Sequence, residues 1–252
     1  MKKLKPVIKT SAAKQIADQI KECIIDGTFK GGDQLPTEHK MSEHFGVSRP
    51  TIREALKKLA AQNLITSRRG PAGGTFIRDY SVDDAADFLT SSTMLMLSFG
   101  SLSFSDVIYV RHFLQYECCL LVIKNWSDEK EAEIRKSLER LKSSELSDEE
   151  FCELDVQFHR SIIDATDNNM LKYMMYGVME ALIPVMNMII VDVTDRNTMI
   201  EYYDQLIKTL SNQKPDKTLK ILTQIKDHLS EKYSAAQRLR AEKHLQYSQF
   251  SK

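Results

Sequence analysis

The stretch "GVSRPTIREAL", residues 46–56, has the composition of a short helix with a marked N-terminus. Ser48 is a preferred N-cap residue, and Pro50 falls in the first turn, where a missing backbone N–H does no harm. Backbone N–H groups at a helix start favour phosphate, and arginine side chains pair with guanine edges in the major groove. The polar side chains that project from this start are Arg49, Thr51 and Arg53. Taken by themselves, they could equally form a solvated face.

The residues on either side complete a helix-turn-helix pattern with a wing. One helix is expected over about residues 10–27 and a second over about 37–45, just before the helix that opens at Ser48. Two short helices separated by a glycine turn are typical of helix-turn-helix units. After them, "LITSRR" and "GTFIRD" predict two short strands around a glycine-rich hairpin loop, residues 70–74.

The order of helix, "PTE", helix, "GVSRPTIREAL", helix and wing resembles the N-terminal domain of GntR-superfamily transcription regulators, over about residues 10–78. The resemblance implies that this part binds double-stranded DNA. One departure is His39, which stands where the family commonly has an arginine. A mostly neutral histidine brings less charge to a phosphate, so we expect weaker or differently spaced backbone anchoring there. Carried over by position, the candidate DNA-binding residues are Glu38, His39, Ser48, Arg49, Pro50, Thr51, Arg53, Arg69 and Gly70.

Charge divides the chain into two parts. Residues 1–79 hold 15 Lys/Arg against 8 Asp/Glu, a net charge of +7, while the remainder holds 20 against 27, a net charge of −7. Parts of opposite charge are expected to meet different partners.

The four cysteines lack metal-ligand spacing and predict reduced thiols in a cytoplasmic protein. No apolar run approaches the ~20 residues of a membrane-spanning helix, so no membrane partner is expected.

From about residue 80 onward the sequence is periodic and poor in helix breakers, which predicts an all-helical domain of roughly six or seven helices. A Met-rich segment in this part should be kinked by Pro184. The expected fold class is therefore mainly α. It consists of a winged helix-turn-helix DNA-binding domain over residues 1–79 and a helical bundle for effector binding and dimerisation over residues 80–252.

One predicted helix carries two polar residues on its apolar side. Ser147 and Glu150 fit a capping box at its start, and Asn168 is expected to cap its end. Asp155 and His159 lie one turn apart among positions that are otherwise apolar. An inward carboxylate without a partner costs ~1–3 kcal/mol. The two residues could simply hydrogen-bond each other as a structural pair, or they could belong to a ligand site.

The helical part resembles the C-terminal domain of the FadR subfamily, of the FCD type, through "YVRHFL", "LDVQFHRSIIDATDNN" and "IKDHL". In such family members an Asp and three His residues ring a metal that helps to hold a small carboxylate effector. The resemblance therefore implies one divalent ion, zinc, manganese or nickel. The implied metal ligands are Asp155, His159 and His228, and the implied effector-binding residues are Arg111, Asp155, His159, Tyr203 and His228.

The fourth position of that ring falls on Tyr203, whose neutral phenol is a poor metal ligand. Other members of the subfamily lack the metal and bind a long acyl-CoA, so a metal-free pocket for an acyl-CoA or a fatty acid is the alternative. Arg111 shares a helix stripe with Val107 and Leu114, and it could point inward to a ligand carboxylate or lie exposed or at an interface. Gln115 stands where the family usually has Glu, which leaves the arginine less neutralised.

These features predict a homodimeric transcription regulator, a repressor by default, that reads a near-palindromic operator. Binding of a small effector would change its affinity for the operator. The protein is not expected to be an enzyme. A metal-dependent hydrolase, with Asp155, His159 and His228 around the metal, is a rival interpretation, although no general base or nucleophile is visible beside them. An architectural DNA-binding protein without an effector pocket is another.

Overall fold

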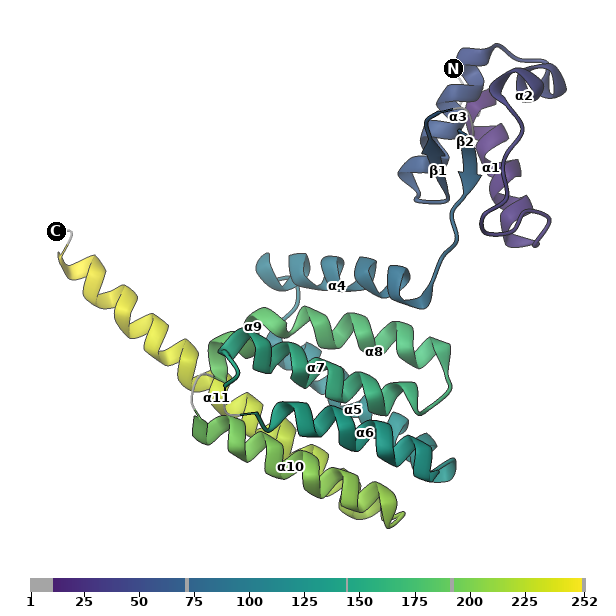
Figure 1. Ribbon diagram of the computed structural model, residues 1–252. Coiled ribbons are helices and arrows are strands. Elements are labelled where there is room, and N and C mark those ends of the chain that lie inside the picture. The colour runs from purple at the N-terminus through teal and green to yellow at the C-terminus, as the bar shows by residue number, and fades with distance from the viewer. Residues whose placement is uncertain (1–10, 71–72, 144, 191–192, 251–252) are drawn as a thin grey trace, which may run out of the picture. The chain divides into compact units, whose positions relative to one another are not determined.

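The computed structural model of the protein describes residues 11–70, 73–143, 145–190 and 193–250, with side-chain burial described as far as residue 242 (Figure 1). The chain divides into two compact units, Met1–Ser81 and Val82–Lys252. Each unit has a hydrophobic core of its own.

The first unit contains three helices and one two-stranded sheet among its described residues. They are α1 (Ala12–Ile25), α2 (Glu38–Phe45), α3 (Arg49–Ala61), β1 (Ile65–Arg68) and β2 (Gly74–Ile77). The side chains of Ser11, Thr37 and Ser48 cap the three helix starts by accepting a backbone N–H. Gly46 ends α2 with a φ of 62°, which lets the chain turn directly into α3. The helix-turn-helix fold predicted from the sequence is confirmed.

The core of the first unit lies where α1 packs on α3. Ile52 and Leu59 of α3 are fully buried there, and burial of such a side chain contributes ~1.5–3 kcal/mol. Strands β1 and β2 pair antiparallel with Ile65 opposite Ile77, and both of these side chains are buried against the helices' core. The pair forms the predicted wing; its loop residues 71–72 lie outside the described residues.

The second unit is all-helical among its described residues, as predicted. Its helices are α4 (Val82–Ser98), α5 (Phe104–Lys124), α6 (Asp128–Leu141), α7 (Asp148–Asp164), α8 (Asn169–Ala181), α9 (Ile183–Ile189), α10 (Val193–Ser211) and α11 (Pro215–Phe250). Figure 1 shows α4 running alongside α8, with which it packs. Helix α5 packs against α7, α8, α10 and α11, so it lies in the middle of the bundle.

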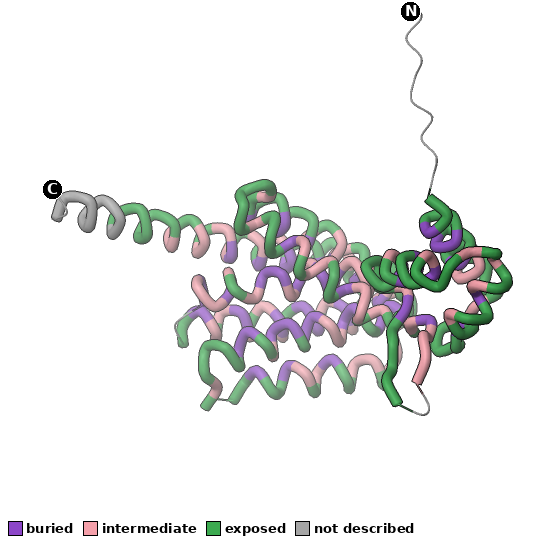
Figure 2. Tube along the Cα trace, turned by 90° about the horizontal axis from the view of Figure 1, so that it is seen from above, coloured by how far each residue is buried: buried purple, intermediate pink, exposed green. Residues whose placement is uncertain are grey.

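Helix α5 can pack against several helices because it has apolar side chains on most of its circumference, although Tyr109 and Phe113 on one side of it remain exposed. Its buried apolar residues include Val107, Cys119 and Val122. Figure 2 shows the buried residues gathered along the inner sides of the helices. Two buried residues of α5, Arg111 and Gln115, are polar and therefore need polar partners inside the bundle.

Two local features differ from the prediction. Pro184 stands in the first turn of α9, where no backbone donor is needed, and the Met-rich segment is divided into α8 and α9 instead of being kinked within one helix. This break helps to raise the number of described helices to eight, above the six or seven predicted.

Asn168 caps the start of α8 and not the end of α7. Ser147 and Glu150 form the predicted capping box.

The four cysteines are free thiols, as predicted. Burial raises the pKa of Cys118 and that of Cys152 to about 12, so these thiols stay protonated near neutral pH. Of the helices in the described ranges, none is long and apolar enough to cross a membrane.

Candidate DNA-binding surface and buried polar site

Local hydrogen bonds fix the start of α3. Ser48 Oγ accepts the backbone N–H of Thr51 at 3.4 Å and lies 2.9 Å from the Thr51 hydroxyl oxygen. Arg49 and Pro50 are exposed, whereas Ile52 is fully buried and anchors the helix to the core. The first turn of α3 therefore presents its polar side chains to solvent from a helix that is held on its other side.

Arg53 is oriented by the preceding helix. Its Nε donates to Glu38 Oε2 of α2 at 2.8 Å, and its side chain remains 61% exposed. An exposed ion pair of this kind contributes about 0–1 kcal/mol, so a stronger partner can replace Glu38. His39, the departure from the family pattern, lies 3.4 Å from Glu43 on its own helix.

The wing carries further cationic side chains of the first unit. Arg69 and Gly70 follow β1 and are exposed. Gly70 has a φ of 107°, a conformation that side chains with a Cβ rarely adopt, so glycine suits this position. The guanidinium carbon of Arg68 lies 4.8 Å above the centre of the Phe76 ring, a cation–π contact that steadies the base of the loop.

Five buried polar side chains form a network in the second unit, and each is at most 3% exposed. Arg111 and Gln115 come from α5, Asp155 and His159 from α7, and Tyr203 from α10. Arg111 Nη2 lies 2.9 Å from His159 Nε2, and the Gln115 side-chain amide lies 2.7 Å from His159 Nδ1. The Tyr203 hydroxyl donates to the Asp155 carboxylate. The polar groups thus satisfy one another inside an apolar bundle.

The imidazole of His159 is neutral in this setting. Burial, and after it the charge of Arg111, hold the pKa of His159 well below its usual value. Nε2 accepts from the Arg111 guanidinium, which can only donate, so the single ring proton lies on Nδ1. Because Nδ1 carries the proton, its partner must be an acceptor. Gln115 therefore turns its side-chain oxygen toward Nδ1, which is the flipped orientation of a carboxamide whose nitrogen and oxygen are interchangeable.

Asp155 and Tyr203 form the other part of the network. Burial raises the pKa of Asp155, and the Arg111 charge and the Tyr203 hydrogen bond oppose this rise. Burial and the nearby Asp155 carboxylate raise the pKa of Tyr203 well above its usual value, so the phenol keeps the proton that it donates. The Phe158 ring stacks on the Tyr203 ring with centroids 4.4 Å apart, which holds the phenol in place.

His228 of α11 has different neighbours. Its Nε2 lies 3.8 Å from an Asp195 carboxylate oxygen, which also pairs with Lys232. Within the described residues, no three His, Cys, Asp or Glu side chains converge as a group that could hold a metal ion. The structure brings four of the five predicted effector residues together but does not add His228 to Asp155 and His159 as a third metal ligand.

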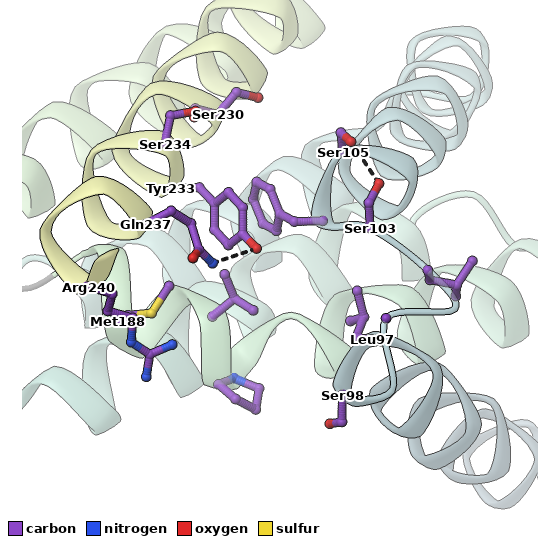
Figure 3. A pocket seen from close by; sticks show the side chains of 15 residues that line it. Leu97, Ser98, Ser103, Ser105, Met188, Ser230, Tyr233, Ser234, Gln237 and Arg240 are labelled. Carbon is purple, nitrogen blue, oxygen red and sulfur yellow. Dashed lines mark hydrogen bonds between the residues drawn. The ribbon is translucent and has the colours of Figure 1, made fainter. Parts of the chain in front are cut away.

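Space beside the network is small. A cavity of about 10 Å³ lies between α5 and α11, lined by Arg111, Gln115 and Lys226 among others, and such a volume holds about one water molecule. A cleft of about 800 Å³ opens elsewhere in the second unit, where α4 and α5 meet α9 and α11 (Figure 3). Figure 3 shows Tyr233 and Gln237 of α11 at this cleft, joined by a hydrogen bond of 2.8 Å.

Two family profiles match the chain. The one described as "Bacterial regulatory proteins, gntR family" matches residues 12–77, and the one described as "FCD domain" matches residues 106–230. The chain belongs to the GntR family. Its first unit contains the GntR DNA-binding domain and its second unit contains the FCD domain, so this GntR protein is a DNA-binding transcription regulator of the FCD type. The resemblance stated from the sequence is confirmed.

The chain is similar to individual transcriptional regulators and to a solved structure. The uncharacterised HTH-type transcriptional regulator YcbG of Bacillus subtilis is 26% identical over 215 residues, 85% of this chain and 87% of that protein. The HTH-type transcriptional regulator LutR of Bacillus subtilis is 26% identical over 163 residues, 65% of this chain and 72% of that protein. The solved structure of Streptococcus agalactiae GntR shares the fold, with a TM-score of 0.60 at 21% identity over 88% of this chain and 99% of that chain.

Gln115 is the residue of this GntR protein's network that the sequence did not mark as a site residue. In the sequence it stands out only as a departure from the family's Glu. Its spacing was nevertheless informative, because Gln115 stands four residues after Arg111 on one helix and therefore shares its face. The sequence alone identifies Tyr203 as a poor metal ligand, but its role as the hydrogen-bond donor to Asp155 is visible only in the fold.

Proposed function

We propose that this GntR protein is a homodimeric repressor whose affinity for its operator is controlled by a small carboxylate bound at Arg111. The observation that carries the proposal is a buried guanidinium that is hydrogen-bonded to a neutral imidazole. A carboxylate is a stronger and often bidentate acceptor for a guanidinium than a neutral group is. An incoming carboxylate would therefore displace His159 as the acceptor of Arg111.

An effector can bind at Arg111 only if the bundle opens. This opening would couple effector binding to operator affinity. The cavity of about 10 Å³ beside Arg111 is too small for a carboxylate. Its walls belong to α5 and α11, and Lys226 of α11 is a second cation at its edge. An effector that favours an opened bundle over the closed one shifts the balance between the two, and operator affinity changes if the opened form binds DNA differently.

On the DNA side, we propose that the start of α3 reads base edges while the wing contacts the backbone. Ser48, Arg49, Pro50, Thr51 and Arg53 supply the first surface, and Arg69 and Gly70 the second. Glu38 orients Arg53, and His39 meets a phosphate. A single helix-turn-helix unit reads a half-site, so two copies related by a twofold axis would read a near-palindromic operator.

The test measures operator affinity by fluorescence anisotropy, with a duplex selected from a random pool and constant ionic strength. Acetate, L-lactate and succinate are the carboxylate probes. We expect at least one of them to weaken binding by about 5- to 150-fold, the range of ordinary allosteric coupling. Arg111→Gln should remove this response. Arg140→Gln is the matched control, because Arg140 is an exposed arginine of the same domain that lies outside the network and donates to Gln157.

Two results would contradict the proposal that the effector is a carboxylate. One is an affinity unchanged by every probe, and the other is an Arg111→Gln variant that still responds as the wild type does. A steady preference for one selected duplex over random DNA would leave the DNA-binding assignment intact in both cases.

The cleft of Figure 3 supports a second candidate effector, a fatty acid or acyl-CoA. Its volume of about 800 Å³ suits an acyl chain, and Leu97, Phe104 and Met188 give it apolar walls while Arg240 lies at its edge. Dodecanoate and palmitoyl-CoA are the probes for this candidate. If they occupy the cleft, Met188→Trp should weaken their effect on operator affinity, whereas Arg111→Gln should not.

A further inference from the structure

The FCD resemblance implies a divalent metal, and the donor atoms in this protein can be tested against that expectation. A metal ion needs several lone pairs that converge on one point and are free of other cations. The implied ligands are Asp155, His159 and His228, with Tyr203 at the remaining ring position. The network around Arg111 determines whether these atoms are free.

The nitrogen atoms of His159 are both engaged. Nε2 lies 2.9 Å from the Arg111 guanidinium and Nδ1 lies 2.7 Å from the Gln115 amide. A metal at Nε2 would have to replace a guanidinium that carries positive charge and is only 3% exposed. Two cations cannot share one buried lone pair, so the position beside Nε2 belongs to Arg111 in this arrangement.

Asp155 and Tyr203 also lack the arrangement that a metal requires. The phenol is protonated and donates to the carboxylate, so its oxygen is a donor toward Asp155 and a neutral, weak ligand toward a metal. The carboxylate accepts from Tyr203, and the charge of Arg111 favours its ionised form. The third implied ligand, His228, has a buried Nε2 without a hydrogen-bond partner, but its acidic neighbour is Asp195 at 3.8 Å, and among the described residues it does not join Asp155 and His159 in a metal-ligand group. These residues do not fit a divalent metal.

We infer that Arg111 and Tyr203 together replace the metal of the FCD site: Arg111 supplies the buried positive charge, and Tyr203 supplies the hydrogen bond that holds Asp155. The guanidinium acts electrostatically on the Asp155 carboxylate and supplies the positive charge that an effector carboxylate requires. The effector part of this inference rests on the proposed function; the metal part does not. Gln115 contributes by fixing the His159 ring so that Nε2 faces Arg111.

The first experiment measures metal directly. Full-length protein is purified without chelator and analysed for metal content, then dialysed against zinc, manganese or nickel and analysed again. We expect far less than one ion per chain in each case, and a thermal unfolding midpoint that neither EDTA nor the added ions change. Retention of about one ion per chain, with a midpoint that falls when EDTA removes it, would overturn the inference. This result needs no variant, so it stands even if a substitution prevents folding.

The second experiment places a histidine at position 203, the ring position where the metal-binding family members have one. Tyr203→His removes the phenol that donates to Asp155 and adds an imidazole beside Asp155 and His159. In an Arg111→Gln background, where no guanidinium occupies His159 Nε2, we expect this variant to bind zinc more tightly than the wild type and to be stabilised by it. Tyr173→His is the matched control, because Tyr173 is a partly buried tyrosine on α8, outside the network. Equal zinc binding by the wild type and both variants would contradict the role assigned to Tyr203.

The metal replacement and the carboxylate effector can each be contradicted without affecting the other. Stoichiometric metal in the wild type would end the metal replacement and leave operator binding and the carboxylate response untouched. Absence of any carboxylate response would end the effector proposal and leave the metal measurements unchanged.

Discussion

The two units of this GntR protein hold their candidate residues in opposite ways. In the first unit most candidate DNA-binding side chains are exposed, and their few contacts, such as Arg53 with Glu38, are weak pairs at the surface. In the second unit the polar residues are buried and each depends on the others, as His159 does on Arg111 and Gln115. Exposed residues remain available to a new partner, whereas buried ones have a new partner only if an old one is displaced. Substitutions should therefore change binding in the first unit and stability in the second.

The largest effect is expected from Asp155→Ala. It leaves the buried Tyr203 hydroxyl without its acceptor and removes the negative charge near Arg111, which should lower the free energy of unfolding by about 3 kcal/mol. Urea denaturation measures this. Glu139→Ala, which breaks the exposed pair with Lys142, should cost ~1 kcal/mol or less. Similar losses of unfolding free energy in the two variants would contradict the expected difference between buried and exposed pairs.

The corresponding change in the first unit is Arg53→Ala. It should weaken specific operator binding by ~1–3 kcal/mol if Arg53 contacts a base, while the free energy of unfolding changes little because the side chain is exposed. Fluorescence anisotropy with the selected duplex and with random DNA measures the specific part. Lys57→Ala on the same helix is the control and should leave base preference unaltered. An unchanged affinity would remove Arg53 from the DNA-binding surface.

Acid should affect stability through His159. Because its pKa is lower in the folded chain than the usual value near 6.5, protons bind the unfolded chain more readily. Stability is therefore full above pH ~6.5 and falls below it, by at most ~1.4 kcal/mol per pH unit for this one group. The raised pKa of Asp155 acts in the opposite direction at lower pH. Urea midpoints at pH 7.5, 6.5 and 5.5 measure the slope, which should be flatter in His159→Gln; equal slopes would rule out a neutral, buried imidazole.

The smallest effect is expected from Glu38→Gln. Losing the surface pair with Arg53 should change the free energy of unfolding by less than ~1 kcal/mol. If Glu38 orients Arg53, operator affinity should fall by less than it does in Arg53→Ala. A loss equal to that of Arg53→Ala would instead indicate that Glu38 itself is required at the DNA.

Most of the first unit could be predicted from the sequence because its structure is set locally. Ser48, Pro50 and Gly46 determine where α3 begins, through a cap, a tolerated proline and a left-handed turn, and each acts within a few residues. The wing strands and the capping box of Ser147 and Glu150 are local in the same sense. The break at Pro184 was located by its residue type, but whether it bends or divides the helix depends on the turn into which it falls.

The sequence determined by itself the DNA-binding fold, the helical character of the remainder and the inward positions of Asp155 and His159, since each follows from local signals: caps, turns and the spacing of apolar residues. Only the tertiary structure decided which polar groups meet. Arg111 and His159 are 48 positions apart, as are Asp155 and Tyr203, and the packing of α5, α7 and α10 brings their donor and acceptor atoms together. A helix period fixes the face on which a side chain lies, but the charge and hydrogen bonds opposite that face come from other helices.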